Sequence, residues 1–192
     1  MWFLRLCVVA CAGSAPLSGV ASAQGGVQST VVGVPTSAVM ASSIAVGVSS
    51  GAIQTLSSVI DNAANNFPSP VTITLTWDLQ PSTGAVQVLA YFANPVAAMT
   101  SGPVAIPSSW LQGRVMTSGT PGAPTTFTPF TQNAVAGVGA AGGSLALMSQ
   151  QVLGNSRTGT RTIDLELRLD LTGRVLTPGT YTGTLNIRAV TQ

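Results

Sequence analysis

The chain has 192 residues, a formal charge of only +2, and neither histidine nor lysine. Its length suits one domain with a sizeable core, and so small a charge argues against nucleic acid as a partner. Thr, Ser and Val are abundant, Gly and Pro are frequent, and the helix formers Lys and Glu are almost missing. This composition favours an all-β domain with many turns.

The first 23 residues have the features of a secretory signal peptide. Arg5 supplies a positive charge, an apolar run follows, and small residues at 21–23 form a cleavage site before Gln24. Gly and Pro residues interrupt the run well short of the ~20 apolar residues that span a membrane. Lipidation at Cys11 is an alternative to cleavage after Ala23. We therefore expect a signal peptide at 1–23 and a single domain at 24–192.

Both cysteines, Cys7 and Cys11, lie in this leader, so the mature chain has none. We expect an exported domain, in the periplasm, at the cell surface or outside the cell, that relies on its core rather than on disulfides. No later apolar run is long enough to span a membrane.

Residues 24–35 are short of charge and prone to form β-structure, which predicts an edge strand or an extended N-terminal arm. The valines of this arm are Val27, Val31, Val32 and Val34. The next segment, 38–50, alternates Ile44, Val46 and Val48 with small residues and is expected to be a strand. In 52–60 the apolar residues match helical spacing, so a short helix is predicted as one alternative there, ahead of a loop at 61–70.

Alternation returns in 71–79, where Trp77 falls in the apolar register and is expected in the core. Residues 85–93 run back after a turn, which predicts a β-hairpin with a loop of about five residues. Six prolines punctuate 94–133, so strands there should be short or at an edge, with 111–116 the best candidate. Residues 144–153 fit helix or strand, and a hairpin into the next strand favours strand.

The clearest strand is 162–171. Apolar residues at every second position, from Ile163 to Leu171, alternate with polar and charged ones. Burying five such side chains is worth roughly 8–15 kcal/mol before entropy is subtracted. Residues 181–190 return as another strand, with Tyr181, Leu185 and Ile187 on one side. The whole pattern predicts an Ig-like antiparallel β-sandwich of seven to nine strands.

Residues 137–142 match the dinucleotide-binding pattern G-x-G-x-x-G, and Asp164 follows at about the distance of a ribose-binding acid. That chemistry needs a buried strand before the glycines and a helix after them. Neither is predicted, so a Gly/Ala-rich loop is the favoured interpretation.

Three of the five acids, Asp164, Glu166 and Asp170, share one face of the 162–171 strand. They would suit calcium if loops added further oxygens. Arg161 and Arg168 are close enough in sequence to pair with them. A solvated outer face that discourages aggregation is therefore the favoured interpretation.

Catalysis has little support in the sequence. Without His, Lys or a mature Cys there is no Ser-His or Ser-Lys pair, no thiolate and no usual zinc ligand set. Carboxylate-pair glycosidase chemistry would have to use the five acids, which are Asp61, Asp78, Asp164, Glu166 and Asp170. We expect no enzyme activity and no cofactor.

Three aromatic residues lie in the Pro/Thr/Gly-rich region and are the candidate contacts for a partner or ligand. They are Trp110, Phe127 and Phe130. Aromatic side chains on loops stack on sugars or anchor proteins. They equally plug the open end of a sandwich, which is the interpretation we favour.

The segment 176–187, with its Pro-Gly-Thr-Tyr turn after the alternating strand 163–171, resembles the last hairpin of bacterial exported Ig-like sandwich proteins. These include fimbrial and spore-coat-U-like pilin subunits. The resemblance implies a subunit of a surface polymer whose sandwich is completed by a strand from a neighbour, with residues 24–35 as the donor arm.

The leading hypothesis is thus an exported, non-enzymatic structural subunit that associates with itself. The alternative is a surface module that binds a glycan or another surface protein.

Overall fold

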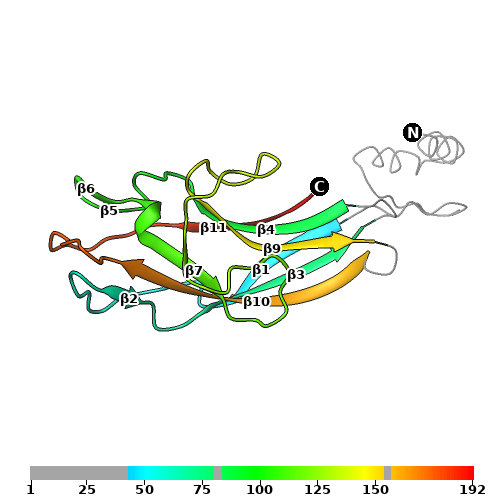
Figure 1. Cartoon of the computed structure of the whole chain (residues 1–192), viewed down its shortest axis with the longest axis horizontal. Coiled ribbons are helices and arrows are strands. Elements are labelled where there is room, and N and C mark those ends of the chain that lie inside the picture. Colours follow the sequence, from blue (N-terminus) through cyan, green and yellow to red (C-terminus); the bar gives the residue numbers. More distant parts are fainter. Residues whose placement is uncertain (1–42, 80–83, 154–156) are drawn as a thin grey trace, which may run out of the picture. The chain divides into compact units, whose positions relative to one another are not determined.

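The computed structural model describes residues 43–79, 84–153 and 157–192 (Figure 1). The predicted signal peptide and N-terminal arm lie outside these residues. Seven of the described strands have five residues or more, four have two or three, and η2 (Ser108–Trp110) is a single 3-10 turn. The strands are β1 (Ser43–Ser50), β2 (Ala64–Asn66), β3 (Val71–Asp78), β4 (Gly84–Phe92), β5 (Met99–Ser101), β6 (Val104–Ile106), β7 (Leu111–Val115), β8 (Thr128–Pro129), β9 (Ser144–Val152), β10 (Thr158–Asp170) and β11 (Leu185–Thr191).

The strands form two facing sheets. The larger sheet has the order β1-β3-β10-β7-β8, with β2 beside the last part of β10. The smaller sheet has the order β11-β4-β9, and β5 and β6 form a separate hairpin. Figure 1 shows the smaller sheet lying across the larger one. The predicted all-β antiparallel sandwich is confirmed.

The core lies between the two sheets and is organised around β10. Ile163 and Leu165 of β10 are fully buried, and they pair in register with Ile73 and Val71 of β3. Val86 and Val88 of β4 are equally buried and belong to the same apolar cluster. The alternation predicted for 162–171 is confirmed, because every second residue from Ile163 to Leu171 is buried and the residues between them are not.

The predicted strand pairings are wrong, although the strands themselves are present. β3 and β4 were expected to form a hairpin, as were β9 and β10, and the resemblance implied a third between β10 and β11. In each case the two strands lie in different sheets. β10 pairs with β3, β7 and β2, whereas β4 pairs with β9 and β11. In these three pairs the consecutive strands therefore lie in opposite layers of the sandwich instead of sharing backbone hydrogen bonds.

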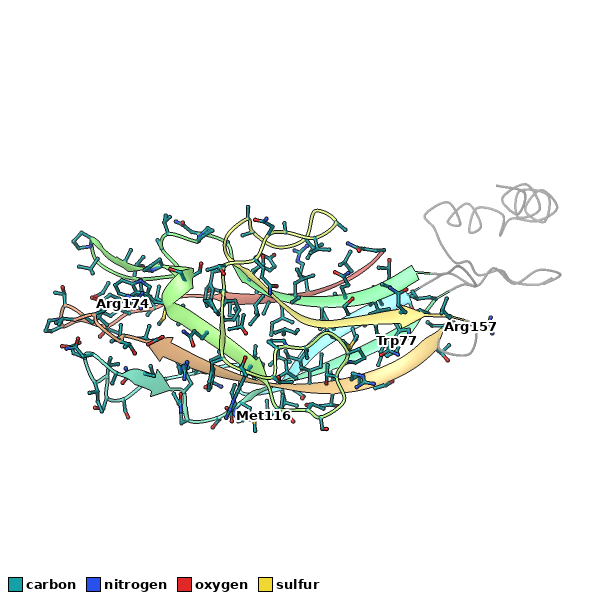
Figure 2. The ribbon with its side chains drawn as sticks, in the orientation of Figure 1. Trp77, Met116, Arg157 and Arg174 are labelled. Carbon is teal, nitrogen blue, oxygen red and sulfur yellow. The ribbon has the colours of Figure 1, made fainter. Side chains whose placement is uncertain are left out.

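Other local expectations are settled by the same strands. Residues 144–153 are a strand, as preferred, and 111–116 contain β7. The helix allowed for 52–60 is absent from this described segment, which has no regular structure. The expected loop 61–70 contains the short β2, and the last strand begins at Leu185 rather than at Tyr181. Trp77 is buried, as predicted, and Figure 2 labels it near the opposite end of the sandwich from Arg174.

Within the described ranges, no helix is both long enough and apolar enough to cross a bilayer.

Candidate functional site

One side of the sandwich is closed by the segment that follows β7. Residues 116–133 cross there from the larger sheet to the smaller one. Val115 of β7 donates its N–H to the Pro124 carbonyl (2.7 Å), and Ser149 of β9 donates its N–H to the Pro121 carbonyl (2.8 Å). The segment therefore fastens the two sheets together and covers part of the outer edge of β9.

The opposite side lies between β1 and β11, the end strands of the two sheets. A cavity of about 290 Å³ opens there, and we call this gap the open seam. Both sheets contribute walls to the cavity, among them Val48, Val71, Leu167, Phe92, Leu185 and Ile187. The inward side chains of β11 are only half-buried, in contrast to the fully buried centre of β10. The apolar interior thus reaches the surface at the open seam.

Strand β11 turns toward the open seam a backbone edge that no other described strand pairs with. Gln192 and Ala85 exchange both backbone hydrogen bonds (2.7 and 2.9 Å), which fixes the alternation along the β11–β4 ladder. The N–H and C=O groups of Leu185, Ile187 and Ala189 consequently point away from β4. Their side chains pack toward the core. An added strand would therefore gain backbone hydrogen bonds and apolar contacts from the same three residues.

A second cavity of about 550 Å³ continues the first. It lies under residues 52–59 and is also lined by Ile106, Leu169 and Tyr181. Four residues line both cavities, namely Gln54, Phe67, Met99 and Gly183. Among the described residues that line the two cavities, none is charged. The pair therefore suits an uncharged occupant.

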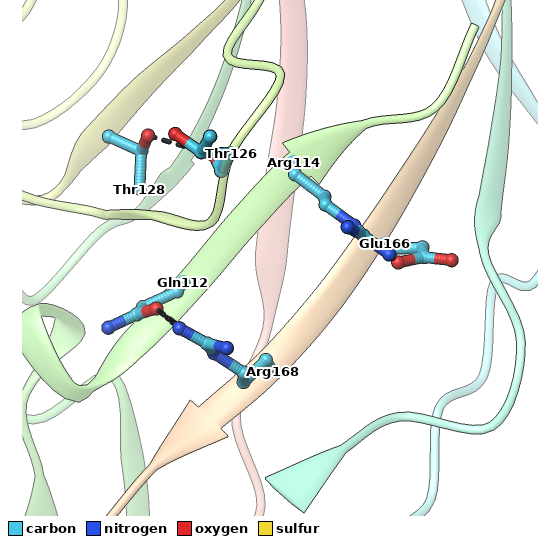
Figure 3. A network of polar contacts seen from close by, with 6 residues as sticks. All are labelled: Gln112, Arg114, Thr126, Thr128, Glu166 and Arg168. Atoms are coloured by element: carbon cyan, nitrogen blue, oxygen red, sulfur yellow. Dashed lines mark hydrogen bonds and ion pairs between the residues drawn. The ribbon is translucent and has the colours of Figure 1, made fainter. Parts of the chain in front are cut away.

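Several charged residues lie instead on the outer face of the larger sheet, among them Arg114, Glu166 and Arg168 (Figure 3). Arg114 Nε donates to Glu166 Oε2 across β7 and β10 (2.7 Å). Arg168 Nε donates to Gln112 Oε1 (3.1 Å). Arg161 was expected to pair with the acids, but it occupies the inward register of β10 and donates to the Gly119 carbonyl instead. That expectation is wrong for Arg161 because side chains an odd number of residues apart on a strand point to opposite faces, and all three acids are an odd number of residues from Arg161.

Each of the three acids on β10 has its own polar partner. Asp164 Oδ1 accepts from the Thr72 hydroxyl (2.8 Å), and Asp170 Oδ2 accepts from Gln112 Nε2 (2.9 Å). Glu166 is paired with an arginine, as described above. In the described part of the chain, no three acidic, His or Cys side chains converge in a way that could hold a metal ion. These partners favour a structural role for the acids.

Hydrogen bonds from Thr172 hold the pKa of the Asp170 carboxyl below its usual value. The Thr172 hydroxyl donates to Asp170 Oδ1 (2.7 Å), and the Thr172 N–H donates to the same oxygen (3.0 Å). The nearby charges of Arg168 and Arg174 act in the same direction, and partial burial opposes them. The ionised carboxylate therefore stabilises the turn after β10.

The three candidate aromatic residues do not form one surface. Phe130 is fully buried and meets Phe92 edge to face, with ring centroids 5.1 Å apart. It therefore cannot contact a partner in this fold, and its inclusion among the contact residues is wrong. Phe127 lies between Arg114 (4.6 Å) and Arg168 (4.2 Å) on the outer face. Trp110 lies under Arg174 (4.8 Å) and packs partly against the core.

The G-x-G-x-x-G segment forms a tight turn, as favoured from the sequence. Val135 and Val138 exchange two backbone hydrogen bonds around Ala136 and Gly137. Both central residues have positive φ, 50° and 76°, which is the pattern of a type I′ turn. The strand and helix that a dinucleotide site requires do not flank it.

Sequence reasoning missed the open seam because its walls come from strands far apart in the chain. The signal that was available is the apolar content of 52–60, which was attributed to helical spacing. Comparison with protein-family models, with curated proteins and with solved structures found no match for this chain. The likeness to pilin subunits stays a prediction that concerns the last strands.

Proposed function

We propose that this protein is an exported, non-enzymatic structural subunit that associates with copies of itself in the cell envelope or outside the cell. The observation that carries the proposal is the open seam. It combines an uncharged apolar groove with a strand edge whose outward N–H and C=O groups have no partner strand among the described residues. Edges of this kind recruit an additional strand, which supplies main-chain hydrogen bonds along the edge and side chains for the groove.

The occupant that we propose is the N-terminal arm, residues 24–35, of a neighbouring copy. The arm carries no charged side chain, which suits the uncharged groove lining, and it contains four valines in eight residues. In an extended strand Val32 and Val34 share one face, and Val27 and Val31 share the other. Only one of these pairs can enter the groove, so the contact depends on backbone pairing as well as on burial.

Size-exclusion chromatography and negative-stain microscopy of residues 24–192 test the proposal, with 36–192 as the arm deletion. We expect assemblies from the longer protein and monomers from the shorter one. Monomers from both, with unchanged thermal stability, would contradict self-association.

Two matched substitutions test the place of contact. Ile187→Asn puts a polar group on the groove wall and should abolish assembly, whereas Val96→Asn, at an exposed position away from the cavity linings, should leave it intact. On the arm, Val32→Asp with Val34→Asp and Val27→Asp with Val31→Asp identify which face enters. If both arm pairs and Ile187→Asn left assembly unchanged, the open seam would not be the contact.

A further inference from the structure

We propose that residues 52–59 form a displaceable strap, which divides the groove of the open seam in two and has to move before one strand can occupy its whole length. This inference rests on the proposed function and concerns how the same site is regulated. The strap follows the end of β1 and crosses toward β2.

The strap is fixed at its two ends and weakly held between them. At one end Gly51 has φ +72° and lies tightly against Pro70 and Val71. At the other end Ile60 donates its N–H to Asn65 Oδ1 (2.7 Å) and accepts from Asn65 Nδ2 (3.0 Å). Between these ends, no hydrogen bond joins the strap to any other described segment. Fixed ends and a loosely held middle are the requirements for a hinged segment.

Few side chains of the strap are buried. Ile53 is 89% exposed, and Val59 is 40% exposed. Leu56 is the strap residue that packs against the core cluster, and it is itself only half-buried. Leu56 therefore supplies most of the apolar burial that holds the strap in place. Ile53 and Val59 contribute little, because their side chains remain in contact with water.

Gln54 is the point at which the strap divides the groove. It lines both cavities, as do Phe67, Met99 and Gly183. Its Nε2 donates to the Gly51 carbonyl (2.9 Å), but its Oε1 is buried with no hydrogen-bond partner. A buried acceptor without a donor disfavours the closed arrangement. Movement of the strap would return this oxygen to water and join the two cavities.

The device implies that the monomer protects its own groove until a competing strand arrives. An added strand that pairs with only part of β11 occupies the first cavity. A strand that occupies the whole groove displaces the strap and enters the second cavity as well. The strap would thereby slow premature pairing of an otherwise exposed edge.

Limited thermolysin proteolysis of residues 36–192, alone and with a synthetic peptide of residues 24–35, tests the inference, because cleavage requires the strap to detach from the sandwich. We expect the peptide to speed cleavage within the strap and to slow hydrogen exchange in β11. Leu56→Ser should raise the rate of strap cleavage at least about fivefold without peptide, with hydrogen exchange of β3, β4 and β10 unchanged. It should also speed peptide association, whereas the exposed Ile53→Ser should change neither rate.

The outcomes separate the two proposals. Protection of β11 with no change in the strap would overturn the strap and leave the proposed function standing. Equal cleavage of the strap in the Leu56→Ser variant and in the wild type would also overturn it, provided that hydrogen exchange of the core strands shows the variant to be folded. Absence of peptide binding would overturn the arm-in-seam contact. Faster strap cleavage in Leu56→Ser would then still establish that the strap is displaceable.

Discussion

Gly159 stands at the start of β10, opposite Trp77 of β3. A Cβ at this position would meet Trp77 ring atoms at 2.7 and 2.8 Å, closer than any normal contact. We therefore expect Gly159→Ala to displace the indole and to lower the free energy of unfolding by about 1–3 kcal/mol. Urea denaturation followed by tryptophan fluorescence measures the change.

Gly47 of β1 is the matched control, since a Cβ there would meet nothing within 4 Å. Gly47→Ala should leave stability unchanged or raise it slightly, because alanine restricts the unfolded chain. Equal effects at the two glycines would show that the Trp77 contact does not constrain β10.

Asp170 makes the stability depend on pH on the acid side. Its pKa is lowered in the folded state from the usual 3.8, so its contribution is present above that value and is lost as the pH falls through the folded pKa. Thr172→Val removes the hydroxyl donor, which is the largest cause of the lowering. We expect a smaller loss of stability between about pH 5 and about pH 2 in this variant than in the wild type.

The control for that comparison is Thr128→Val. The Thr128 hydroxyl donates to the Thr126 carbonyl and has no part in the Asp170 turn. Its acid profile should follow that of the wild type. Urea midpoints across the pH range supply the measurement, and identical profiles for all three proteins would remove Thr172 as the cause.

At the scale of elements, Phe127 attaches the sealing segment 116–133 to the outer face of the larger sheet. Its ring lies between two guanidinium groups, and each such contact at a partly exposed site is worth about 0.5–1 kcal/mol. Phe127→Leu should therefore cost about 1–2 kcal/mol of unfolding free energy and loosen the segment. Hydrogen exchange of 116–133 reports the loosening.

Phe127→Tyr keeps an aromatic face and should retain most of that stability. If leucine and tyrosine behaved alike, the arginines would not be holding the segment through the ring.

The faces of the strands were predictable from sequence, whereas their partners were not. Period-two alternation identified Ile163, Leu165 and Leu185 as inward-facing, because side-chain direction is a local property of an extended chain. Pairing depends on which sheet the next strand joins, and a short connection is compatible with a hairpin or with a crossing between sheets. The alternation of β3 and β4, or of β10 and β11, is the same in both arrangements.

The candidate site was less predictable than the fold, because it depends on which strands become neighbours, and local sequence does not determine those neighbours. The open seam is made where β1 and β11, at the two ends of the described chain, become end strands on one side. No short motif encodes that neighbourhood. Phe130 illustrates the limit, since the sequence allowed it either to contact a partner or to plug the end of the sandwich, and only the fold shows that its ring is buried.

At the scale of the whole molecule, the edge of β11 can be blocked without breaking its ladder to β4. Ala189 directs its N–H away from β4, so Ala189→Pro removes a donor from the free edge alone. We expect a folded protein that no longer assembles. Light scattering coupled to chromatography gives the mass, and circular dichroism confirms the fold.

Arg188 supplies the comparison, because its N–H faces β4. Arg188→Pro should remove a ladder hydrogen bond and destabilise the sandwich itself. Normal assembly by the Ala189→Pro protein would mean that the copies do not join by pairing at β11.

One side of the sandwich is covered by residues 116–133, and the other side is the open seam. This difference between the two sides determines how copies can join. A copy with one acceptor flank and one donor segment offers two unlike faces, so each junction is head-to-tail rather than symmetric. Repeating such a junction yields a closed ring or an unbranched filament with distinguishable ends. Lateral growth into a flat β-aggregate is opposed, since residues 116–133 already cover part of the edge at which a third neighbour would have to attach.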